Sequence, residues 1–333
     1  MQPKISILIP TFNREKKIIS LLKRIEHFFD NNENLKSSFE IHISNNGSID
    51  NTEHLVTDFI KGKKYYYYYN QQNNLGFDKN IEFLFDQVKT EYLWFFSDDD
   101  IFYEFAFEKV LNAVRIEYPD VLLFSFAQPA SNLELTFNFQ QTIHNTRDKK
   151  EIINLIPLFP KLSIYVMKKI VIPEENKLYL NSVIGKGFYF LSLSYTILSL
   201  SPEPKLTILS EQLASSDNDY NHFSIDPDIF LYFYETFQHP FILKYLPNLY
   251  EEKKTLSYVN TLGYLFKIKD GSIIVNDENE YDTYIKKFHF RADILYKKPF
   301  LLLQFILLKT GQVNCYNKYG KLIYDKLVKP LRK

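Results

Sequence analysis

The sequence lacks several features that would place it outside the ordinary globular proteins. It has one cysteine, Cys315, among 333 residues, which excludes an intrachain disulfide and a cysteine-ligated zinc site. Lysine plus arginine equals aspartate plus glutamate at 40 each, so net charge gives no reason to expect a nucleic-acid partner. No stretch reaches the roughly 18 apolar residues of a spanning helix, and the N-terminus shows no signal-peptide pattern. We therefore expect a cytoplasmic protein.

The neutral total hides an uneven distribution of charge. Residues 286–333 carry twelve lysines and arginines against two acidic residues. Within that segment, the apolar run Pro299–Leu308 lies between lysines. Such a stretch can lie on an anionic membrane surface, or it can form a buried C-terminal helix with a basic outer face. The first interpretation predicts a peripheral protein on the cytoplasmic face of the inner membrane.

Strand and helix patterns alternate through the first 127 residues. Patterns typical of strands occur at residues 5–9, 39–44, 65–69, 92–96 and 121–127. Between them, apolar residues recur at helical spacing, beginning with Ile18, Leu22, Ile25 and Phe29. This alternation predicts an α/β fold with a mostly parallel, doubly wound sheet. Ligands of such sheets bind beyond the carboxyl ends of the strands.

Three adjacent carboxylates follow one of the predicted strands. Asp98, Asp99 and Asp100 come directly after the apolar run Leu93–Phe96 and Ser97. Their mutual repulsion is offset by a divalent cation, since Mg²⁺ or Mn²⁺ typically takes one or two carboxylates together with substrate phosphate oxygens. The metal then neutralises charge that develops on a diphosphate leaving group. Taken alone, the triplet is also compatible with an acidic turn that caps the next helix.

Polar residues also follow the first three strands, at the same edge of the predicted sheet. They are Pro10-Thr11-Phe12-Asn13-Arg14, Ser44-Asn45-Asn46-Gly47-Ser48 and Asn73-Asn74-Leu75-Gly76-Phe77-Asp78-Lys79-Asn80. Each block alone is typical of a turn or a helix cap. Together with the acidic triplet they indicate a binding site, in which a hydroxyl, an aromatic ring and an amide contact a base and Lys79 contacts a phosphate as a point charge.

These four blocks resemble the inverting family-2 glycosyltransferases of the GT-A fold, most closely their abequosyltransferase-like branch of bacterial surface-polysaccharide enzymes. The resemblance covers about the first 125 residues. It implies a GT-A-type nucleotide-diphospho-sugar transferase fold and an enzyme that uses a nucleotide-diphospho-sugar donor with Mn²⁺ or Mg²⁺. Asp98 and Asp100 would then hold the metal. The donor would contact Pro10, Thr11, Phe12, Asn13, Asn45, Gly76, Lys79, Asp98 and Asp99.

One of these residues departs from the family pattern. The family usually has Asp where this chain has Asn45. A carboxylate accepts a hydrogen bond from the uracil N3–H, whereas an amide can both donate and accept. The sequence therefore leaves both uracil and cytosine open as the donor base.

The polar segment Ser215-Ser216-Asp217-Asn218-Asp219, near residues 215–225, predicts a domain boundary. It separates a glycosyltransferase domain at residues 1–220, with a donor half (1–127) and an acceptor half (128–220), from a helical C-terminal region (221–333) with the basic tail. An inverting transfer needs a general base, which in the family is a carboxylate of the acceptor half. The candidates here are Asp219, Asp217, Glu211 and His222, which cluster before the helical region, and we favour Asp219. A polar linker is the alternative interpretation of their segment.

The function predicted from these features is sugar transfer in the synthesis of bacterial O-antigen, capsule or lipooligosaccharide. The acceptor would be a glycan, either linked to polyprenyl diphosphate at a membrane surface or already part of a finished polysaccharide. A catalytically degenerate nucleotide-binding partner in a polysaccharide assembly complex is the alternative from another class of protein. Metal-dependent hydrolysis or transfer of the donor distinguishes the two.

Overall fold

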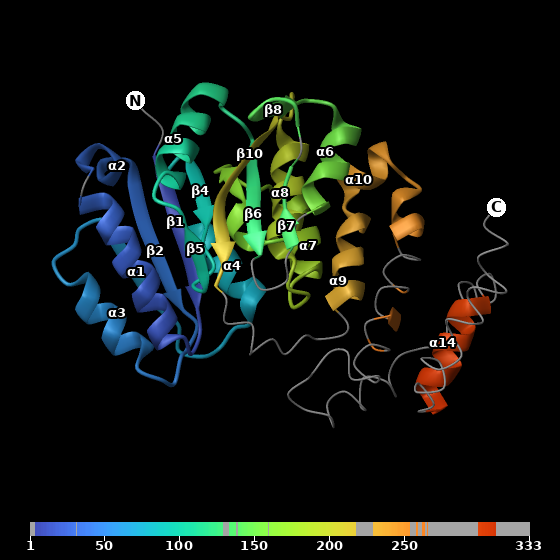
Figure 1. Cartoon of the computed structure of the whole chain (residues 1–333), viewed down its shortest axis with the longest axis horizontal. Helices are drawn as coiled ribbons and strands as arrows, with labels where there is room; N and C mark the ends of the chain where they lie inside the picture. The colour runs from blue at the N-terminus through green and yellow to red at the C-terminus, as the bar shows by residue number, and fades with distance from the viewer. Residues whose placement is uncertain are drawn as a thin grey trace. The chain divides into compact units, whose positions relative to one another are not determined.

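The computed structural model describes residues 4–30, 32–128, 133–137, 139–158, 160–217, 229–253, 258, 262–263, 265 and 299–310 (Figure 1). The chain divides into two compact units. The first consists of Met1–Tyr220 with His239–Leu246, and the second of Asn221–Gln238 with Pro247–Lys333. The sheet lies within the first unit.

Four parallel strands form the first half of the sheet. They are β1 (Ile5–Thr11), β2 (Phe39–Asn45), β3 (Tyr66–Asn70) and β4 (Tyr92–Phe95), in the order β3-β2-β1-β4. Their carboxyl ends meet at one edge, because Thr11 pairs with Asn45 and Asn45 with Asn70. The chain runs from β1 to β3 in one direction and then returns to place β4 on the other side of β1. Ligands of doubly wound sheets bind at such a switch point.

The second half of the sheet is mixed. Its strands are β5 (Asp100–Phe102), β6 (Val121–Gln128), β7 (Leu133–Leu135), β8 (Ile143–Thr146), β9 (Val166–Lys168) and β10 (Leu206–Ser216). In the described part of the chain, all ten strands belong to one sheet that continues as β4-β9-β6-β10-β5. β9 is antiparallel to both β4 and β6, whereas β6 and β10 are parallel. The predicted α/β class is confirmed, and the antiparallel strands are additions that the sequence pattern did not reveal.

Aromatic side chains hold helices on one face of the sheet. The helices are α1 (Glu15–Asp30), α3 (Thr52–Ile60) and α5 (Ala106–Glu117). The Phe107 ring of α5 lies 5.4 Å from the Phe29 ring of α1 and 5.7 Å from Trp94 of β4. All three side chains are fully buried, and burying a Phe side chain stabilises a fold by about 1.5–3 kcal/mol. This cluster fixes α1 and α5 against the strand that precedes the acidic triplet.

The opposite face carries α4 (Phe77–Gln87) and α8 (Tyr189–Leu200), which pack against each other. α4 contacts β1 and β2, and α8 contacts β6 and β9. A right-handed crossover from β3 back to β4 requires α4 to lie on the face opposite α1. Asp78 joins the two helices, because its carboxylate accepts hydrogen bonds from the backbone N–H groups of Gly187 (2.8 Å) and Tyr189 (3.2 Å).

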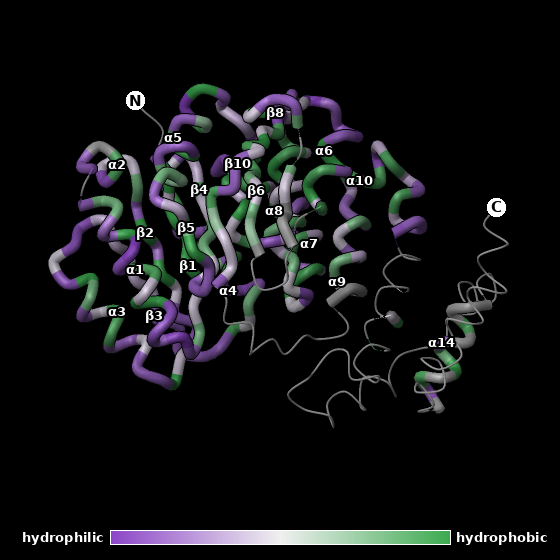
Figure 2. The backbone as a smooth tube through the Cα atoms, in the orientation of Figure 1, coloured by the Kyte–Doolittle hydropathy of each residue, from purple (hydrophilic) through white to green (hydrophobic). Residues whose placement is uncertain are grey.

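The remaining elements complete the two units. The first unit also holds the α-helices α2 (Glu33–Ser38), α6 (Lys149–Leu155), α7 (Glu174–Ser182) and α10 (Pro240–Tyr245) and the 3-10 helices η2 (Ile156–Leu158) and η3 (Leu162–Ile164). The second holds α9 (Ile229–Glu235), η4 (Thr236–Gln238) and α14 (Pro299–Thr310). Figure 2 shows hydrophobic positions, in green, along the inner strands and hydrophilic ones at many turns around them.

Two sequence predictions concern residues outside this description. No helix of the described residues is both long enough and apolar enough to cross a membrane. Of the basic segment 286–333, only α14 is described, and Asp219 also lies outside the described residues. The predictions of a membrane-associating tail and of Asp219 as a base therefore stay predictions.

Candidate active site

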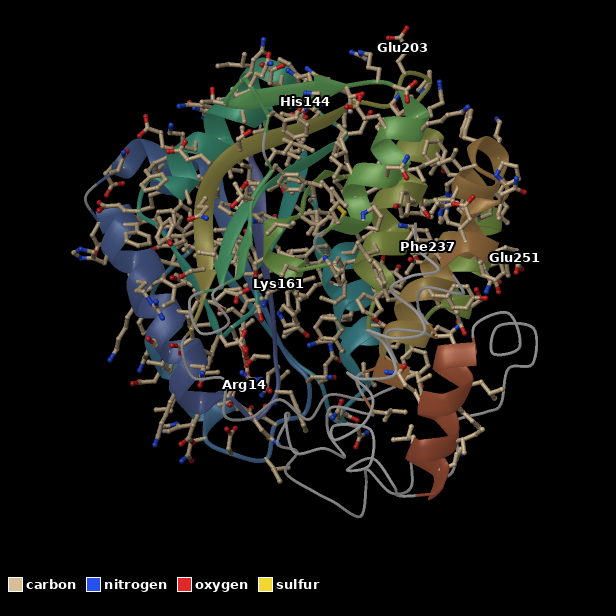
Figure 3. The ribbon with its side chains drawn as sticks, turned by 45° about the vertical axis from the view of Figure 1, so that its right-hand side comes forward. Arg14, His144, Lys161, Glu203, Phe237 and Glu251 are labelled. Carbon is tan, nitrogen blue, oxygen red and sulfur yellow. The ribbon has the colours of Figure 1, made fainter. Side chains whose placement is uncertain are left out.

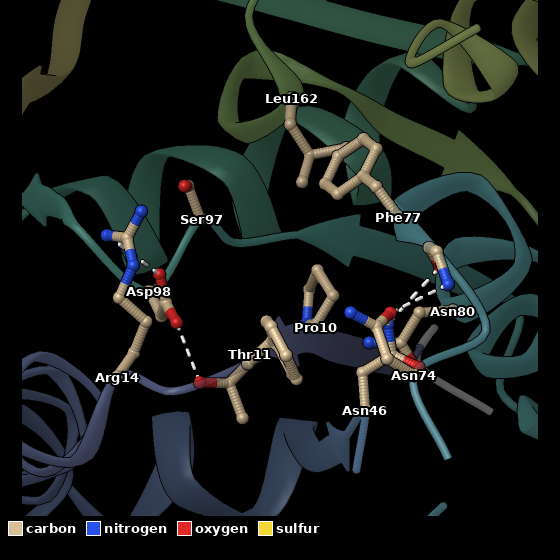
Figure 4. Close-up of a pocket in the computed structure, with 12 residues that line it drawn as sticks. Pro10, Thr11, Arg14, Asn46, Asn74, Phe77, Asn80, Ser97, Asp98 and Leu162 are labelled. Carbon is tan, nitrogen blue, oxygen red and sulfur yellow. Dashed lines mark hydrogen bonds and ion pairs between the residues drawn. The ribbon is translucent and has the colours of Figure 1, made fainter. Parts of the chain in front are cut away.

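A cavity of about 330 Å³ opens where the chain reverses direction between β1 and β4 (Figure 4). Its lining consists of Pro10, Thr11, Phe12, Arg14, Asn46, Asn74, Gly76, Phe77, Asn80, Ser97, Asp98 and Leu162. One end holds charged groups, with Arg14 near Asp98, and the other end holds three asparagines. The cavity thus combines an ionic end, an amide end and the rings of Phe12 and Phe77, and it can accommodate a ligand with both phosphate and base.

Each carboxylate of the acidic triplet is held by a hydroxyl group. Thr11 Oγ1 donates to Asp98 Oδ2 at 2.7 Å, and Ser97 Oγ donates to Asp99 Oδ1 at 2.5 Å. Ser163 Oγ donates to Asp100 Oδ2 at 2.6 Å. Each of the three neighbouring acids therefore has a hydroxyl donor of its own, which favours its charged form.

Arg14 faces two of these carboxylates. Its Nη1 atom lies 3.0 Å from Asp99 Oδ2 and 3.7 Å from Asp98 Oδ1. The backbone N–H of Arg14 donates to Thr52 Oγ1 at 3.3 Å, which fixes the start of α1. Its side chain is 43% exposed, whereas that of Asp98 is 9% exposed. A half-exposed cation therefore covers a nearly buried anion at the wall of the cavity.

Burial governs the protonation of the triplet. It raises the pKa of Asp98 to about 7, although Arg14 and the Thr11 hydroxyl favour the charged form. It likewise raises the pKa of Asp100 to about 6, against the opposing effects of Lys161 and Ser163. Burial also raises the pKa of Asp99, but the Ser97 hydrogen bond and Arg14 outweigh it and the net pKa is lowered. Carboxylates with raised pKa values in a cavity are candidates for a functional role.

The residues present fit a divalent cation only in an open site. Within the described part of the chain, no group of three or more His, Cys, Asp and Glu side chains could enclose a metal. Asp98 lines the cavity with carboxylate oxygens, the ligand type that Mg²⁺ and Mn²⁺ prefer. Mg²⁺ commonly takes one or two carboxylates and completes its coordination with substrate phosphates and water. The donor chemistry of Asp98, with Asp100 behind it, fits that kind of site.

At the amide end of the cavity, hydrogen bonds join the loop after β2 to the loop before α4. Asn46 Nδ2 donates to Asn74 Oδ1 at 2.9 Å, and Asn46 Oδ1 accepts from the backbone N–H of Leu75 at 2.9 Å. Gly47 permits this approach: its φ is +71°, and a Cβ there would lie 2.6 Å from the carbonyl carbon of Asn73. The loop after β2 therefore positions the loop before α4, with Gly76 at the N-terminus of that helix.

Four of the predicted donor-contacting residues are not part of the cavity lining, namely Asn13, Asn45, Lys79 and Asp99. Asn45 is fully buried, and its amide donates to Tyr68 Oη (3.1 Å) and accepts from the Ser48 N–H (3.2 Å). Lys79 pairs with Glu82 at 2.7 Å. Asn13, with φ of +51°, accepts from the Ile49 N–H. The cavity brings together the predicted residues Pro10, Thr11, Phe12, Gly76 and Asp98.

Asp217, one of the predicted general bases, is not part of the cavity lining, and Asp219 lies outside the described residues. The Asp217 carboxylate forms an ion pair with Lys17 at 3.2 Å, and its backbone N–H donates to the Asp99 carbonyl oxygen at 3.3 Å. This contact joins the end of β10 to the acidic triplet. Whether Asp217 or Asp219 acts as the base stays a prediction.

Comparisons with known proteins agree with this architecture. Residues 6–169 match the model of glycosyl transferase family 2. This part of the chain is a glycosyltransferase domain. No curated protein matched the chain in sequence.

Solved structures support the fold of the glycosyltransferase. It is similar to the crystal structure of S. aureus TarS 1–349 in complex with UDP-GlcNAc, with a TM-score of 0.61 at 16% identity over 95% of this chain and 92% of that chain. The structure of TarS 1–349 alone gives a TM-score of 0.58 at 15% identity with the same coverage. At this level of identity the likeness concerns the fold, which is of the GT-A type.

No role was predicted from the sequence for seven of the residues that line the cavity, which are Arg14, Asn46, Asn74, Phe77, Asn80, Ser97 and Leu162. Nor was a role predicted for Ser163, although its Oγ accepts from the Ser97 N–H at 2.9 Å. All of the seven except Leu162 lie inside or directly beside the four motifs, so their position at a strand end was a usable signal. No such signal marked Ser163, because it lies 66 residues after Ser97 and 63 residues after Asp100 in the chain.

Proposed function

We propose that the chain transfers a sugar from a nucleotide diphosphate to a glycan acceptor in bacterial surface-polysaccharide synthesis, with Mn²⁺ or Mg²⁺ as cofactor. The observation that carries this proposal is the cavity between β1 and β4, which places Asp98, Arg14 and the ring of Phe12 around one space. The fold likeness to TarS with UDP-GlcNAc supports a nucleotide-sugar donor. O-antigen, capsule and lipooligosaccharide are the polysaccharides we consider, in keeping with the abequosyltransferase-like motifs.

Different residues of the cavity would contact different parts of the donor. Phe12 and Pro10 offer apolar surface to the base, and Asp98 lies where it can meet both ribose and cation. Asn80 adds a polar group, because its Nδ2 donates to the Ser44 carbonyl oxygen while its buried Oδ1 has no partner among the described residues. We keep Asn45 and Lys79 as proposed donor contacts whose side chains would have to leave Tyr68 and Glu82. Asp99 would orient Arg14.

The chemistry we propose is a single displacement with inversion. A metal bound at Asp98 and Asp100 supplies charge neutralisation for the departing diphosphate. The chain's own contribution is to hold the donor between the two ends of the cavity and to accept the proton of the attacking hydroxyl. Asp219 or Asp217 would take that proton, which typically contributes about 10²–10⁴-fold to the rate. The acceptor we propose is a glycan, carried on polyprenyl diphosphate at the cytoplasmic face of the membrane.

A donor screen tests the proposal. Thermal unfolding is measured with UDP-, CDP-, GDP- and dTDP-sugars, each with Mn²⁺ or with EDTA. One of these nucleotide classes should raise the unfolding temperature in the presence of Mn²⁺, since a ligand at 100 times its Kd stabilises the native state by about 2.7 kcal/mol. The sugar that binds is then tested for Mn²⁺-dependent hydrolysis. Binding without turnover would favour the degenerate binding partner, and no binding of any donor would contradict both.

A further inference from the structure

Arg14 occupies the position from which a cation would approach the acidic triplet. Asp98 Oδ2 and Asp99 Oδ1 are each taken by a hydroxyl group. The other oxygens, Asp98 Oδ1 and Asp99 Oδ2, both face the Arg14 guanidinium, at 3.7 Å and 3.0 Å. Any cation that binds Asp98 through its remaining oxygen therefore meets the positive charge of Arg14.

The same residue is well placed to meet an anionic ligand. Arg14 is the only basic side chain among the described residues that line the cavity. Its guanidinium is a planar fork that matches carboxylate and phosphate groups equally well. With 43% of its side chain exposed, it can turn from the carboxylates toward the cavity without unpacking the core.

We propose that Arg14 is the resident counter-ion of Asp98 and Asp99 in the donor-free protein, and that it moves to the donor diphosphate when a divalent cation takes its place. This inference rests on the proposed function, because it presupposes a metal and a diphosphate at this cavity. Arg14 keeps the nearly buried carboxylate of Asp98 and the partly exposed one of Asp99 paired in the donor-free protein. It also opposes the binding of metal alone, because the displaced guanidinium has no new partner until a diphosphate arrives.

This exchange makes metal and donor bind cooperatively. In the absence of donor, the cation must displace Arg14. In its presence, the displaced Arg14 gains a phosphate partner, so each ligand strengthens the binding of the other by the same factor. Lys161 is the other basic residue whose charge acts on the triplet, on Asp99 and Asp100. Its ammonium lies 4.9 Å from the Phe126 ring centroid, and the residue is not part of the cavity lining.

The test measures Mn²⁺ binding to the full chain at pH 8 without donor, by the electron paramagnetic resonance signal of free Mn²⁺. Arg14→Gln is expected to bind Mn²⁺ about tenfold more tightly than the wild type, the order of one charged contact. At saturating Mn²⁺, the same variant should bind UDP or CDP, whichever the wild type binds, about tenfold more weakly. If nucleotide affinity without metal is unchanged, the coupling between metal and nucleotide then falls about tenfold.

The matched control is Arg147→Gln, which removes another arginine that is paired with a carboxylate, Glu203 at 3.4 Å. In Figure 3, Glu203 and Arg14 lie at opposite ends of the first unit. The control should leave both affinities within about twofold, since exposed ion pairs are worth little. Thermal unfolding of each variant checks that it is folded. Arg14→Lys serves as a second variant: as a point charge it cannot span both carboxylates, so it should bind Mn²⁺ about threefold more tightly.

The outcomes separate this inference from the proposed function. A wild type that binds no Mn²⁺, with or without nucleotide, would contradict the proposed metal dependence and with it the counter-ion role. A wild type that binds both ligands, but whose Mn²⁺ affinity is unchanged or weakened in both Arg14 variants, would overturn the counter-ion role alone.

Discussion

The first compact unit has two parts, residues 1–127 (the first half) and residues 128–217 (the second half), which use their polar residues in different ways. Eleven of the twelve residues that line the cavity come from the first half, and only Leu162 comes from the second. In the second half, the buried Ser163 hydroxyl forms hydrogen bonds with the Ser97 N–H and with Asp100. The cavity-lining residues therefore gather in the strand-end loops of the first half, while the second half contributes hydrogen bonds that hold the acidic triplet.

The largest effect on sugar transfer is expected when the charge of Asp98, in the first half, is removed. Asp98→Asn should lower the rate of sugar transfer by about 10²–10³-fold, the range for loss of one electrostatic contact to the transition state. The fold should remain intact, because a neutral amide is easier to bury than the carboxylate whose pKa burial raises to about 7. Steady-state kinetics with saturating Mn²⁺ measures the loss.

The matched control lies in the second half. Glu174→Gln breaks an ion pair with Lys177 on a side chain that is 85% exposed. It should change transfer by less than about twofold. Equal losses of the transfer rate in Asp98→Asn and in this control variant would contradict the difference between the two halves.

Gly47→Ala should cause the next largest effect. The added Cβ would lie 2.6 Å and 2.8 Å from backbone atoms of Asn73 and Asn74, at a φ of +71°. The backbone conformation alone costs about 1–2 kcal/mol, and displacement of the loop should bring the total to about 3 kcal/mol. Donor affinity should fall as well, because the displaced loop lines the cavity. Denaturant unfolding measures the loss in the free energy of unfolding.

Gly187→Ala provides the comparison from the second half. Its φ is +79°, but a Cβ there meets nothing within 4 Å. This substitution should cost only the backbone penalty of about 1–2 kcal/mol and leave donor affinity unchanged. Similar losses of stability at both glycines would show that the backbone of Asn73 and Asn74 moves away from the added Cβ at little cost.

Ser163→Ala tests the supporting role of the second half. It leaves the Ser97 N–H and Asp100 Oδ2 without their partner, which should cost about 1–3 kcal/mol and weaken Mn²⁺-dependent donor binding about tenfold. Ser194→Ala is the control, because its hydroxyl only donates to the Leu191 carbonyl oxygen within α8. Calorimetric titration measures donor affinity in both variants. Unaltered donor affinity in Ser163→Ala would contradict the role of Ser163 in holding the acidic triplet.

The smallest predicted effect concerns a buried histidine that has no part in the cavity. His239 Nδ1 accepts from the Phe241 N–H, so the neutral ring carries its proton on Nε2, 3.0 Å from Thr196 Oγ1. Burial lowers the pKa of His239 to about 3. The unfolded chain binds a proton below about pH 6.5 and the folded chain does not. Acid therefore favours unfolding, by about 1.4 kcal/mol at pH 5.5.

Denaturant unfolding at pH 7.5 and pH 5.5 measures this contribution. In His239→Asn, which keeps an N-capping side chain before α10, the difference between the two pH values should shrink by about that amount. An unchanged difference would assign the pH dependence to other groups.

The sequence was sufficient to predict the parallel half of the sheet and the edge that carries the site. Largely apolar runs such as Ile5–Ile9, interrupted only by Ser6, are typical of strands buried between helical layers, and their ends mark the binding edge. It could not show which residue of each motif faces the cavity. Asn45, the last residue of β2, turns to Tyr68 on the neighbouring strand, whereas Asn46 turns to the loop before α4.

The second half of the sheet was harder to predict for a physical reason. β5, β7 and β9 have three residues each, too few to show an alternating pattern. Their positions follow from pairing with strands far away in the sequence, such as Val166 of β9 with Trp94. Ser163 meets the acidic triplet only through such long-range contacts, and no local pattern encodes them.

We predict that the donor binds in the cavity between β1 and β4. A crystal structure of the chain with Mn²⁺ and the nucleotide found in the screen tests this, because the anomalous signal of manganese distinguishes the metal from lighter atoms. We expect an anomalous peak about 2.0–2.3 Å from a carboxylate oxygen of Asp98, with the diphosphate beside Arg14. A metal and nucleotide bound elsewhere on the chain, with Arg14 still paired to Asp99, would contradict it.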